Sequence, residues 1–168
     1  MNFRKSNEND INKIIEMIEE AKEYFKSNNI GQWQDGYPNY QVILEDINKG
    51  YSFVFTEKDN IVASVAISFD GENTYNYIYE GKWLSNEKYC VIHRLVVDSK
   101  LKGNGISSKI IKKIEEICLD NNIHSIKIDT HKENLSMQKL LKKITFLIVE
   151  LFIWKAKLQE LLLRNYFK

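Results

Sequence analysis

The residues with the clearest chemical potential are two glycines that stand between a buried strand and an amphipathic helix. The stretch 91–114 reads VIHRLVVDSKLKGNGISSKIIKKI and predicts a strand, a short polar turn and a helix. A helix start leaves about four backbone N–H groups without partners and carries partial positive charge. Because Gly103 and Gly105 have no Cβ, a phosphate can approach this backbone, and Lys100 and Lys102 add positive charge. The pattern predicts a pyrophosphate cradle, although two glycines in such a turn can also be only a tight connection.

Two common phosphate-binding motifs are excluded in this segment. A Walker A loop requires Gly-Lys followed by Ser or Thr, and no such sequence follows the glycines. The dinucleotide fingerprint requires a third Gly or Ala three residues after Gly105, where this chain has Ser108. Neither an ATP-binding P-loop nor a dinucleotide-binding turn is therefore expected here.

The bulk composition is that of an ordinary globular protein of one domain. The chain has 168 residues, a hydrophobic fraction of 43% and a formal net charge of +1, so nothing favours nucleic acid or an anionic membrane as a partner. Cys90 and Cys118 lack metal-ligand or CxxC spacing, which predicts small core residues in a reducing compartment and no metal site. The N-terminus lacks an apolar leader and no apolar run reaches the ~18–20 residues of a membrane span, so we expect a cytoplasmic protein.

Apolar periodicity predicts the elements that position the glycine loop. Ile11, Ile14, Ile15, Ile18 and Ala21 recur at helical spacing and predict a first helix from about Asp10 to Lys26, capped by Asn9 or Asp10. The other expected elements are a short strand at 2–5, a helix at 40–49, strands at 51–57, 61–69, 89–97 and 124–130, and helices at 106–119 and 134–143. Residues 70–88 predict a loose hairpin extension or a long loop. The fold class is α/β (α+β), with a central twisted mixed sheet flanked by helices.

This order of elements resembles the GNAT superfamily of N-acetyltransferases. In that family the loop has Arg/Gln-x-x-Gly-x-Gly/Ala after a strand ending in valine. Here Val97 ends the strand, and the loop holds Lys102, Gly103, Asn104, Gly105, Ile106 and Ser107. The family then has Asn, a small residue three positions on, and Leu-Tyr; here the matching positions hold Asn134, Met137, Leu140 and Leu141. The resemblance covers residues 1–143, which we expect to form the acetyltransferase domain.

The resemblance implies acetyl-CoA as co-substrate and assigns its contacts. Backbone groups of Leu95, Val96 and Val97 would pair with the pantetheine amides. The N–H groups from Lys102 to Ser107 would hold the pyrophosphate. Asn134 would hydrogen-bond the cofactor near its thioester or pantetheine arm. Lys102 and Ser107 depart from the family pattern but keep the charge and the backbone donors of the cradle.

The catalytic assignments are open. His93 lies two residues before the cofactor-binding part of its strand, and an ordinary histidine titrates near ~6.5, which suits a general base; it can also be a half-buried strand residue. Asp129, at the end of the next strand, is a second candidate or a loop cap. Arg94 should point to the opposite face from His93, while His124 and His131 predict exposed loop residues. Leu141 replaces the tyrosine that protonates the leaving thiolate in many members, so the general acid is unassigned.

The acceptor is expected to be a primary amine of a small molecule or peptide. Aromatic residues in two loops could line its site or could be ordinary packing: Trp33, Tyr37, Tyr75, Tyr77 and Trp83. Two other functions remain possible on this sequence. One is a non-catalytic acyl-CoA-binding or regulatory domain of the same fold, and the other is a protein-interaction module whose glycine loop is only a turn.

Residues 144–168 change in character and predict an atypical tail within the same domain. From Thr145 to Phe167 there is no Gly, Pro, Asp or Ser, and the family's Gly-Phe turn and last two strands are not recognisable. Reverse translation from the third base of the Lys143 codon gives NNFSYCGIIYLESKATRIAFEKLL and then a stop, which has the expected strand, hairpin and strand. We therefore expect a frameshifted C-terminus, with a helical tail over a vacated sheet edge, a homodimer formed through either, and impaired turnover.

Overall fold

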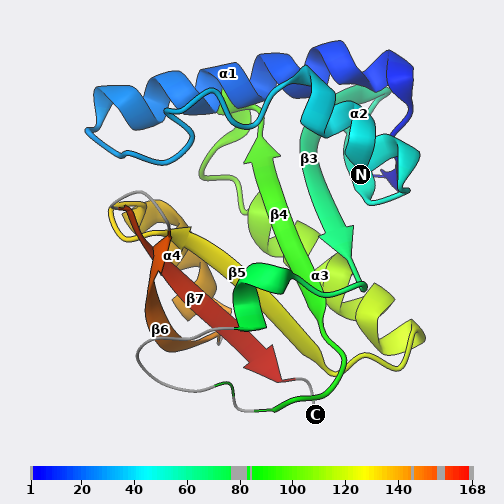
Figure 1. Ribbon diagram of the computed structural model, residues 1–168. Helices are drawn as coiled ribbons and strands as arrows, with labels where there is room; N and C mark the ends of the chain where they lie inside the picture. Colours follow the sequence, from blue (N-terminus) through cyan, green and yellow to red (C-terminus); the bar gives the residue numbers. More distant parts are fainter. Residues whose placement is uncertain (1, 77–82, 84, 145, 155–157, 167–168) are drawn as a thin grey trace. The chain divides into compact units, whose positions relative to one another are not determined.

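The computed structural model describes residues 2–76, 83, 85–144, 146–154 and 158–166, and it contains both helices and strands (Figure 1). The chain forms two compact units, one of residues 1–67 and 93–110 and the other of residues 68–92 and 111–168. Strand β4 (Cys90–Val97) and helix α3 (Ile106–Asp120) each run from one unit into the other. Up to Lys143, the helices and strands predicted from periodicity are confirmed to within one residue at each end.

The first unit begins with a strand and two helices and continues with a hairpin. Its elements are β1 (Asn2–Lys5), the 3-10 helix η1 (Glu8–Asp10), α1 (Ile11–Ser27), α2 (Tyr40–Asn48), β2 (Ser52–Glu57), β3 (Asn60–Ser68) and the 3-10 helix η3 (Ser99–Leu101). β2 pairs with both β1 and β3 in antiparallel register. The turn between β2 and β3 has two residues, Lys58 and Asp59, both at positive φ as tight hairpins require.

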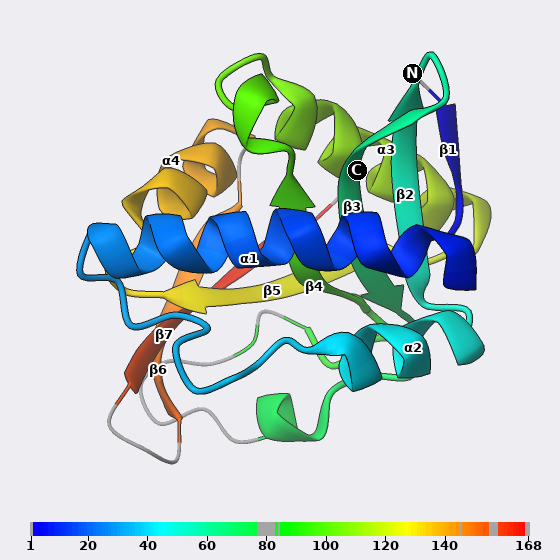
Figure 2. The ribbon, with the colours of Figure 1, turned by 90° about the horizontal axis from the view of Figure 1, so that it is seen from above.

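The core of the first unit is the apolar face of α1 packed on α2 and the strands. Figure 2 shows α1 lying across β2 and β3. The predicted stripe is confirmed, with Ile15 at its partly buried margin, and it is extended by Met17 and Phe25. The buried cluster comprises Ile11, Ile14, Met17, Ile18, Ala21, Phe25, Ile30, Ile43, Val54 and Val96. Because Val96 belongs to β4, this core fixes the strand that leads into the glycine loop.

The second unit contains a mixed sheet in the order β4-β5-β7-β6. β4 pairs in parallel with β5 (Ser125–His131) from Cys90↔Ile126 to Ile92↔Ile128. Helix α4 (Leu135–Lys143) follows β5, and η2 (Asn73–Asn76) precedes β4. Cys90 and Cys118 are both free and fully buried, as expected for core residues. Within the described residues, no helix has the length and apolar character needed to span a bilayer.

The prediction of a helical tail is wrong. Residues Leu147–Trp154 form β6 and Leu158–Tyr166 form β7 (Figure 1). β7 lies antiparallel to β5 from Ser125↔Tyr166 to His131↔Glu160, and β6 pairs with β7. The reason is that an uncovered strand offers a row of unpaired backbone N–H and C=O groups, which the tail satisfies by pairing with β5 as a strand. The edge of β5 is therefore covered and not vacated.

The segment between β3 and β4 is only partly described. η2 at Asn73–Asn76 takes up part of it, and Trp83 is described as irregular chain. Residues 77–82 and 84, which include the predicted acceptor-site residue Tyr77, lie outside the described residues.

The carboxylate of Asp10, just before α1, accepts hydrogen bonds from a preceding backbone N–H and from an arginine side chain. Asp10 was expected to cap α1, but its side chain makes no cap hydrogen bond to that helix. It accepts instead from the backbone N–H of Asn7 at 2.8 Å and from two guanidinium nitrogens of Arg4 at 2.7 and 2.9 Å. The hydrogen bond from Arg4 is the main cause that lowers the pKa of Asp10, with burial acting in the opposite direction.

We predict that Asp10→Asn lowers the free energy of unfolding at pH 7 by about 1–2 kcal/mol. The folded-state pKa of Asp10 is depressed, so its contribution is present above the unfolded-state pKa of ~3.9 and is lost as the pH falls through the folded value. Urea unfolding at pH 7 and near pH 3 should show the difference between variant and wild type shrinking in acid. Asp120→Asn, at an exposed carboxylate, is the control; an equal loss there would contradict a specific role for Asp10.

Candidate functional site

The glycine loop has the geometry expected of a ligand cradle. Gly103 and Gly105 adopt left-handed φ values of +84° and +74°, which residues with a side chain rarely tolerate. A Cβ built at either position would meet no atom within 4 Å, so both backbones face open space. α3 begins at Ile106, directly after the second glycine. A helix start with open glycines in front of it fits a phosphate group.

Not every N–H group of the loop is available to a ligand. The N–H of Lys102 points to the carbonyl of Ser99 and that of Asn104 to the carbonyl of Leu101, both at a long 3.4 Å. The hydrogen bonds among the described residues do not include the N–H groups of Gly103, Gly105 or Ile106. The N–H groups without a protein partner among the described residues are thus those of the two glycines and of Ile106, and the role of the run from Lys102 to Ser107 in holding a pyrophosphate stays a prediction.

The charge of Lys102 is directed toward α1. Its ammonium lies 4.3 Å from the centre of the Tyr24 ring, a cation–π contact on an exposed surface. Lys102, which was expected beside the pyrophosphate, thus contacts Tyr24 of the same unit. A ligand anion would compete with this weak contact.

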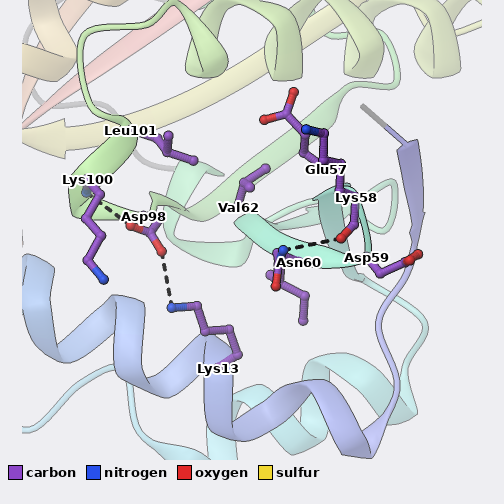
Figure 3. Close-up of a pocket in the computed structure, with 10 residues that line it drawn as sticks. Lys13, Glu57, Lys58, Asp59, Asn60, Val62, Asp98, Lys100 and Leu101 are labelled. Atoms are coloured by element: carbon purple, nitrogen blue, oxygen red, sulfur yellow. Dashed lines mark hydrogen bonds and ion pairs between the residues drawn. The ribbon is translucent and has the colours of Figure 1, made fainter.

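An open pocket of about 720 Å³ lies beside Asp98, at the end of β4 (Figure 3). It is lined by α1, the β2–β3 turn and residues 98–101. Asp98 accepts from Lys13 at 3.1 Å and from the N–H of Lys100 at 3.0 Å, which ties α1 to the turn that precedes the glycines. The lining has three lysines but also three carboxylates, Glu57, Asp59 and Asp98. Because these charges balance, the lining does not favour a polyphosphate.

Strand β4 departs from ordinary strand geometry at Arg94, where φ is +53°. The Arg94 guanidinium donates to both oxygens of Asp46 on α2, with Nε–Oδ2 at 2.6 Å and Nη2–Oδ1 at 2.7 Å. Its Nη1 donates to the hydroxyl of Tyr37. His93, the residue before Arg94, is half-buried. The left-handed residue interrupts the regular alternation of the strand, and the expectation that Arg94 faces away from His93 stays a prediction.

The Arg94–Asp46 pair is largely withdrawn from solvent, with side chains 13% and 9% exposed. Burial raises the pKa of the Asp46 carboxyl, and the charge and hydrogen bonds of Arg94 act against that rise. The pKa of Arg94 is raised, because Tyr37 and Asp46 together outweigh the effect of burial on the guanidinium. Both oxygens of Asp46 accept charged hydrogen bonds, so we treat the pair as ionised. This cluster was missed by sequence reasoning.

The aromatic residues expected around the acceptor fall into two groups with different environments. In the first unit, Trp33 packs edge-on against Phe25 at 5.5 Å and belongs to the margin of the core, whereas Tyr37 is 38% exposed. In the second unit, Tyr75 is only 3% exposed and Trp83 donates its indole N–H to the Tyr75 carbonyl at 2.7 Å. Of these two tyrosines, Tyr37 and not Tyr75 presents an accessible ring.

A buried lysine occupies the aromatic cluster of the second unit. The ammonium of Lys127, on β5, lies 3.9 Å from the centre of the Trp83 ring and 3.7 Å from that of Tyr89. Two residues along the same face of β5, Asp129 accepts a hydrogen bond from the hydroxyl of Tyr75. The single lysine in the otherwise apolar run SIKI was the sequence signal for this arrangement, since a lysine is rarely buried without partners.

The end of β5 corrects one expectation. His131 was expected in an exposed loop, but it is the last residue of β5 and is 1% exposed, because the strand extends one residue further than predicted and β7 covers it. Its Nδ1 accepts from the N–H of Glu133 at 3.3 Å, and among the described residues its Nε2 has no partner. Burial lowers the pKa of His131. His124 is exposed, as expected.

Two residues of α4 bear on the cofactor and the general acid. Asn134 caps the helix, since its side-chain oxygen accepts from the N–H of Met137 at 3.1 Å. Helix capping accounts for the spacing of Asn134 and Met137, and a contact of Asn134 with the cofactor stays a prediction. Leu141, at the position where a tyrosine was considered, is fully buried in the core and supplies no proton.

Comparison with known proteins identifies the family. The chain is similar over 99% of its length to a GNAT-family acetyltransferase from Streptococcus agalactiae 2603, with 28% identity, a TM-score of 0.88 and 95% of that chain covered. A candidate acetyltransferase from Staphylococcus aureus Mu50 matches with 25% identity and a TM-score of 0.76, with 99% of each chain covered. The fold alone is shared with yncA from Salmonella typhimurium, solved with acetyl-CoA, at 13% identity and a TM-score of 0.68, over 100% of this chain and 94% of that one.

Comparison with curated proteins finds none similar enough to count as a match. The sequence model of the acetyltransferase (GNAT) family, however, matches residues 14–146, which contain most of α1, the glycine loop and α4. This chain therefore belongs to the acetyltransferase (GNAT) family.

Proposed function

We propose that this protein transfers the acetyl group of acetyl-CoA to a primary amine of a small molecule or peptide. The observation that carries the proposal is the pair of left-handed glycines whose open backbones face outward at the start of α3. Members of the matched family are acetyl-CoA-dependent transferases, which agrees with a cradle for the pyrophosphate of a coenzyme.

Acetyl-CoA supplies an activated thioester carbonyl. The N–H groups of Gly103, Gly105 and the first turn of α3 would hold the pyrophosphate, and the backbone from Leu95 to Val97 would pair with the pantetheine amides. The N–H of Leu95 or Val96 would donate to the oxyanion that develops on the attacked carbonyl. These assignments carry the cofactor contacts implied by the family resemblance over to backbone groups of this chain.

His93 is proposed to take the proton of the attacking amine, directly or through water. The new carbon–nitrogen bond forms, the carbon–sulfur bond breaks, and the thiolate takes up a proton. Asp129 is proposed as a second catalytic residue beside His93 in the reaction scheme, and its carboxylate accepts a hydrogen bond from the hydroxyl of Tyr75. On the acceptor side, Tyr37 is the accessible aromatic candidate, and Trp33, Tyr75 and Trp83 stay proposed as substrate-binding residues.

A non-catalytic acyl-CoA-binding domain is the second candidate function. The burial of Leu141 favours it, because that position supplies no acid for the leaving thiolate. The two functions differ in one measurable quantity, the release of free thiol from acetyl-CoA in the presence of a panel of amines. Binding of acetyl-CoA without amine-dependent thiol release would support the non-catalytic function.

We also propose that residues 144–168 are translated out of frame after loss of one A in the codons for Lys142 and Lys143. Two observations support this. The family match ends at residue 146, and a reverse translation with A/T-rich codons, read in the shifted frame, would encode a strand, a polar hairpin and a strand before its stop. The tail as written forms strands β6 and β7. A shift of frame would therefore change the residue types in these strands and would not remove the strands.

The cradle predicts that Gly105→Asp weakens acetyl-CoA binding at least tenfold, about 1.4 kcal/mol. The added carboxylate would repel the pyrophosphate and its Cβ would fill the space in front of the loop. Isothermal titration calorimetry with acetyl-CoA measures the effect.

Gly36→Asp is the matched control for the strain of the substitution. Gly36 has a similar φ of +88° and equally open space, but it lies in the loop before α2. We expect both variants to lose similar stability in thermal melts and only Gly105→Asp to lose affinity. Equal affinity of the two variants would remove the cradle assignment.

If His93 is the general base, His93→Gln lowers kcat at least about tenfold and leaves acetyl-CoA affinity unchanged. The acidic limb of the rate profile, between about pH 6 and 7 for an ordinary histidine, should disappear. The pH dependence of thiol release measures this. His124→Gln, at an exposed histidine, should keep the wild-type profile; a wild-type profile in His93→Gln would reduce His93 to a packing residue.

Restoring one A after the Lys142 codon should produce a more stable and more active chain. We expect a melting temperature higher by at least about 5 °C, equivalent to about 2 kcal/mol for a chain of this size, and faster amine-dependent thiol release. Resequencing the gene and weighing the native protein determine which frame is expressed. If the restored chain gains neither stability nor activity, the out-of-frame proposal has no functional consequence.

A further inference from the structure

Arg94 occupies a backbone conformation that strand residues do not normally adopt. Residues in strands have φ near −120° to −140°, whereas Arg94 has φ +53° within β4. Left-handed geometry is unfavourable for a residue with a Cβ and persists only where the surrounding structure holds it. The chain uses arginine here although glycine would adopt the same φ without strain.

The interactions of the side chain account for this choice. The fork of Arg94 meets both oxygens of Asp46 at 2.6 and 2.7 Å, in the parallel arrangement that makes Arg–carboxylate pairs strong. Asp46 is 6% exposed and is fixed on α2, whose first turn is capped by Asn39. A buried, hydrogen-bonded charge pair of this kind offsets a local conformational cost.

The same guanidinium also reaches the loop before α2. Its remaining terminal nitrogen donates to the hydroxyl of Tyr37, and its carbon lies 5.9 Å from the centre of the Tyr37 ring. One side chain therefore fixes three pieces of the first unit: strand β4, helix α2 and the loop that carries Tyr37. Of these three, β4 is the proposed cofactor-binding strand and the loop that carries Tyr37 is the proposed acceptor-binding loop.

The geometry points to Arg94 as a positioning residue that couples the two substrate sites. Its pairing with Asp46 holds the left-handed turn that sets the backbone direction of Leu95 to Val97, and its hydrogen bond holds Tyr37. The inference rests on the proposed function only for the identity of the ligands. Arg94 itself touches neither the thioester nor the amine in this assignment.

The backbone part of the inference is tested by the order of two truncations. Ala and Gly both remove the ion pair, but only Gly relieves the strain at positive φ. In an ordinary strand Gly is the less stable of the two. We therefore expect Arg94→Gly to melt at a higher temperature than Arg94→Ala, and to bind acetyl-CoA at least threefold more tightly.

Arg4 provides the matched control. It also lies on a strand of the first unit and makes a two-point pair with an aspartate, Asp10, but it is not among the residues at positive φ. Arg4→Gly should melt at a lower temperature than Arg4→Ala. The same order at both positions would show that the backbone at Arg94 is not held in the left-handed form, and would overturn the inference.

The coupling part is tested by separating the two substrates. Arg94→Lys keeps the charge but loses the fork, and we expect at least fivefold weaker acetyl-CoA binding by calorimetry together with a raised KM for the amine. Tyr37→Phe removes only the hydroxyl contact, so we expect unchanged acetyl-CoA affinity and a raised KM for the amine at least threefold. Unchanged values in Arg94→Lys would reduce Arg94 to a structural residue.

Failure of this inference is distinguishable from failure of the proposed function. If the wild-type chain does not bind acetyl-CoA, the proposed function fails, and the melting order of the Ala and Gly variants still decides the backbone part. If the truncations at Arg94 do not fold, Asp46→Asn removes part of the pair while leaving the backbone sequence unchanged. We expect it to weaken acetyl-CoA binding in the same direction; wild-type affinity in that variant would overturn the inference.

Discussion

The buried pair of Arg94 and Asp46 is the interaction on which the geometry of the first unit depends. It lies where β4 changes role: upstream, Cys90 to Ile92 make parallel pairs with β5, and downstream the strand leads through Val97 into the glycine loop. A continuous strand would carry its alternation unbroken through this point. The left-handed residue re-aims the strand, and the ion pair supplies the stabilisation that such a residue requires.

The glycine loop solves the same conformational problem without side chains. Gly103 and Gly105 also adopt positive φ, but they meet open space and need no compensating contact. The difference follows from what each position must do. A loop that receives a phosphate needs bare backbone, whereas a strand held against α2 needs a side chain that fixes its position. Within about ten residues of one segment, the chain thus compensates backbone strain at Arg94 with a specific partner and avoids such strain at Gly103 by using glycine.

The sequence allowed prediction of what depends on local pattern. The stripe on α1, the buried run of β4 and the glycines before α3 were all recognisable, because burial and turn geometry impose residue types at fixed spacing. Partners distant in sequence were not recognisable. Arg94 and Asp46 are separated by 48 positions, and no periodicity relates them. The burial of Lys127 against two rings and of His131 beside β7 likewise depends on which segments the sheet brings together.

The tail shows how strongly an existing sheet selects the structure of the next segment. Residues 147–163 contain apolar residues at spacings that suit a helix as well as a strand, so local pattern cannot decide between them. β5 decides, because its outer edge presents backbone donors and acceptors that any chain without proline can pair with. Backbone pairing places few demands on side-chain identity, whereas recognition of a substrate depends on it. A sequence can therefore complete the sheet without supplying the side chains that bind an acceptor. For this reason the intact fold supports turnover less strongly than the glycine loop supports coenzyme binding.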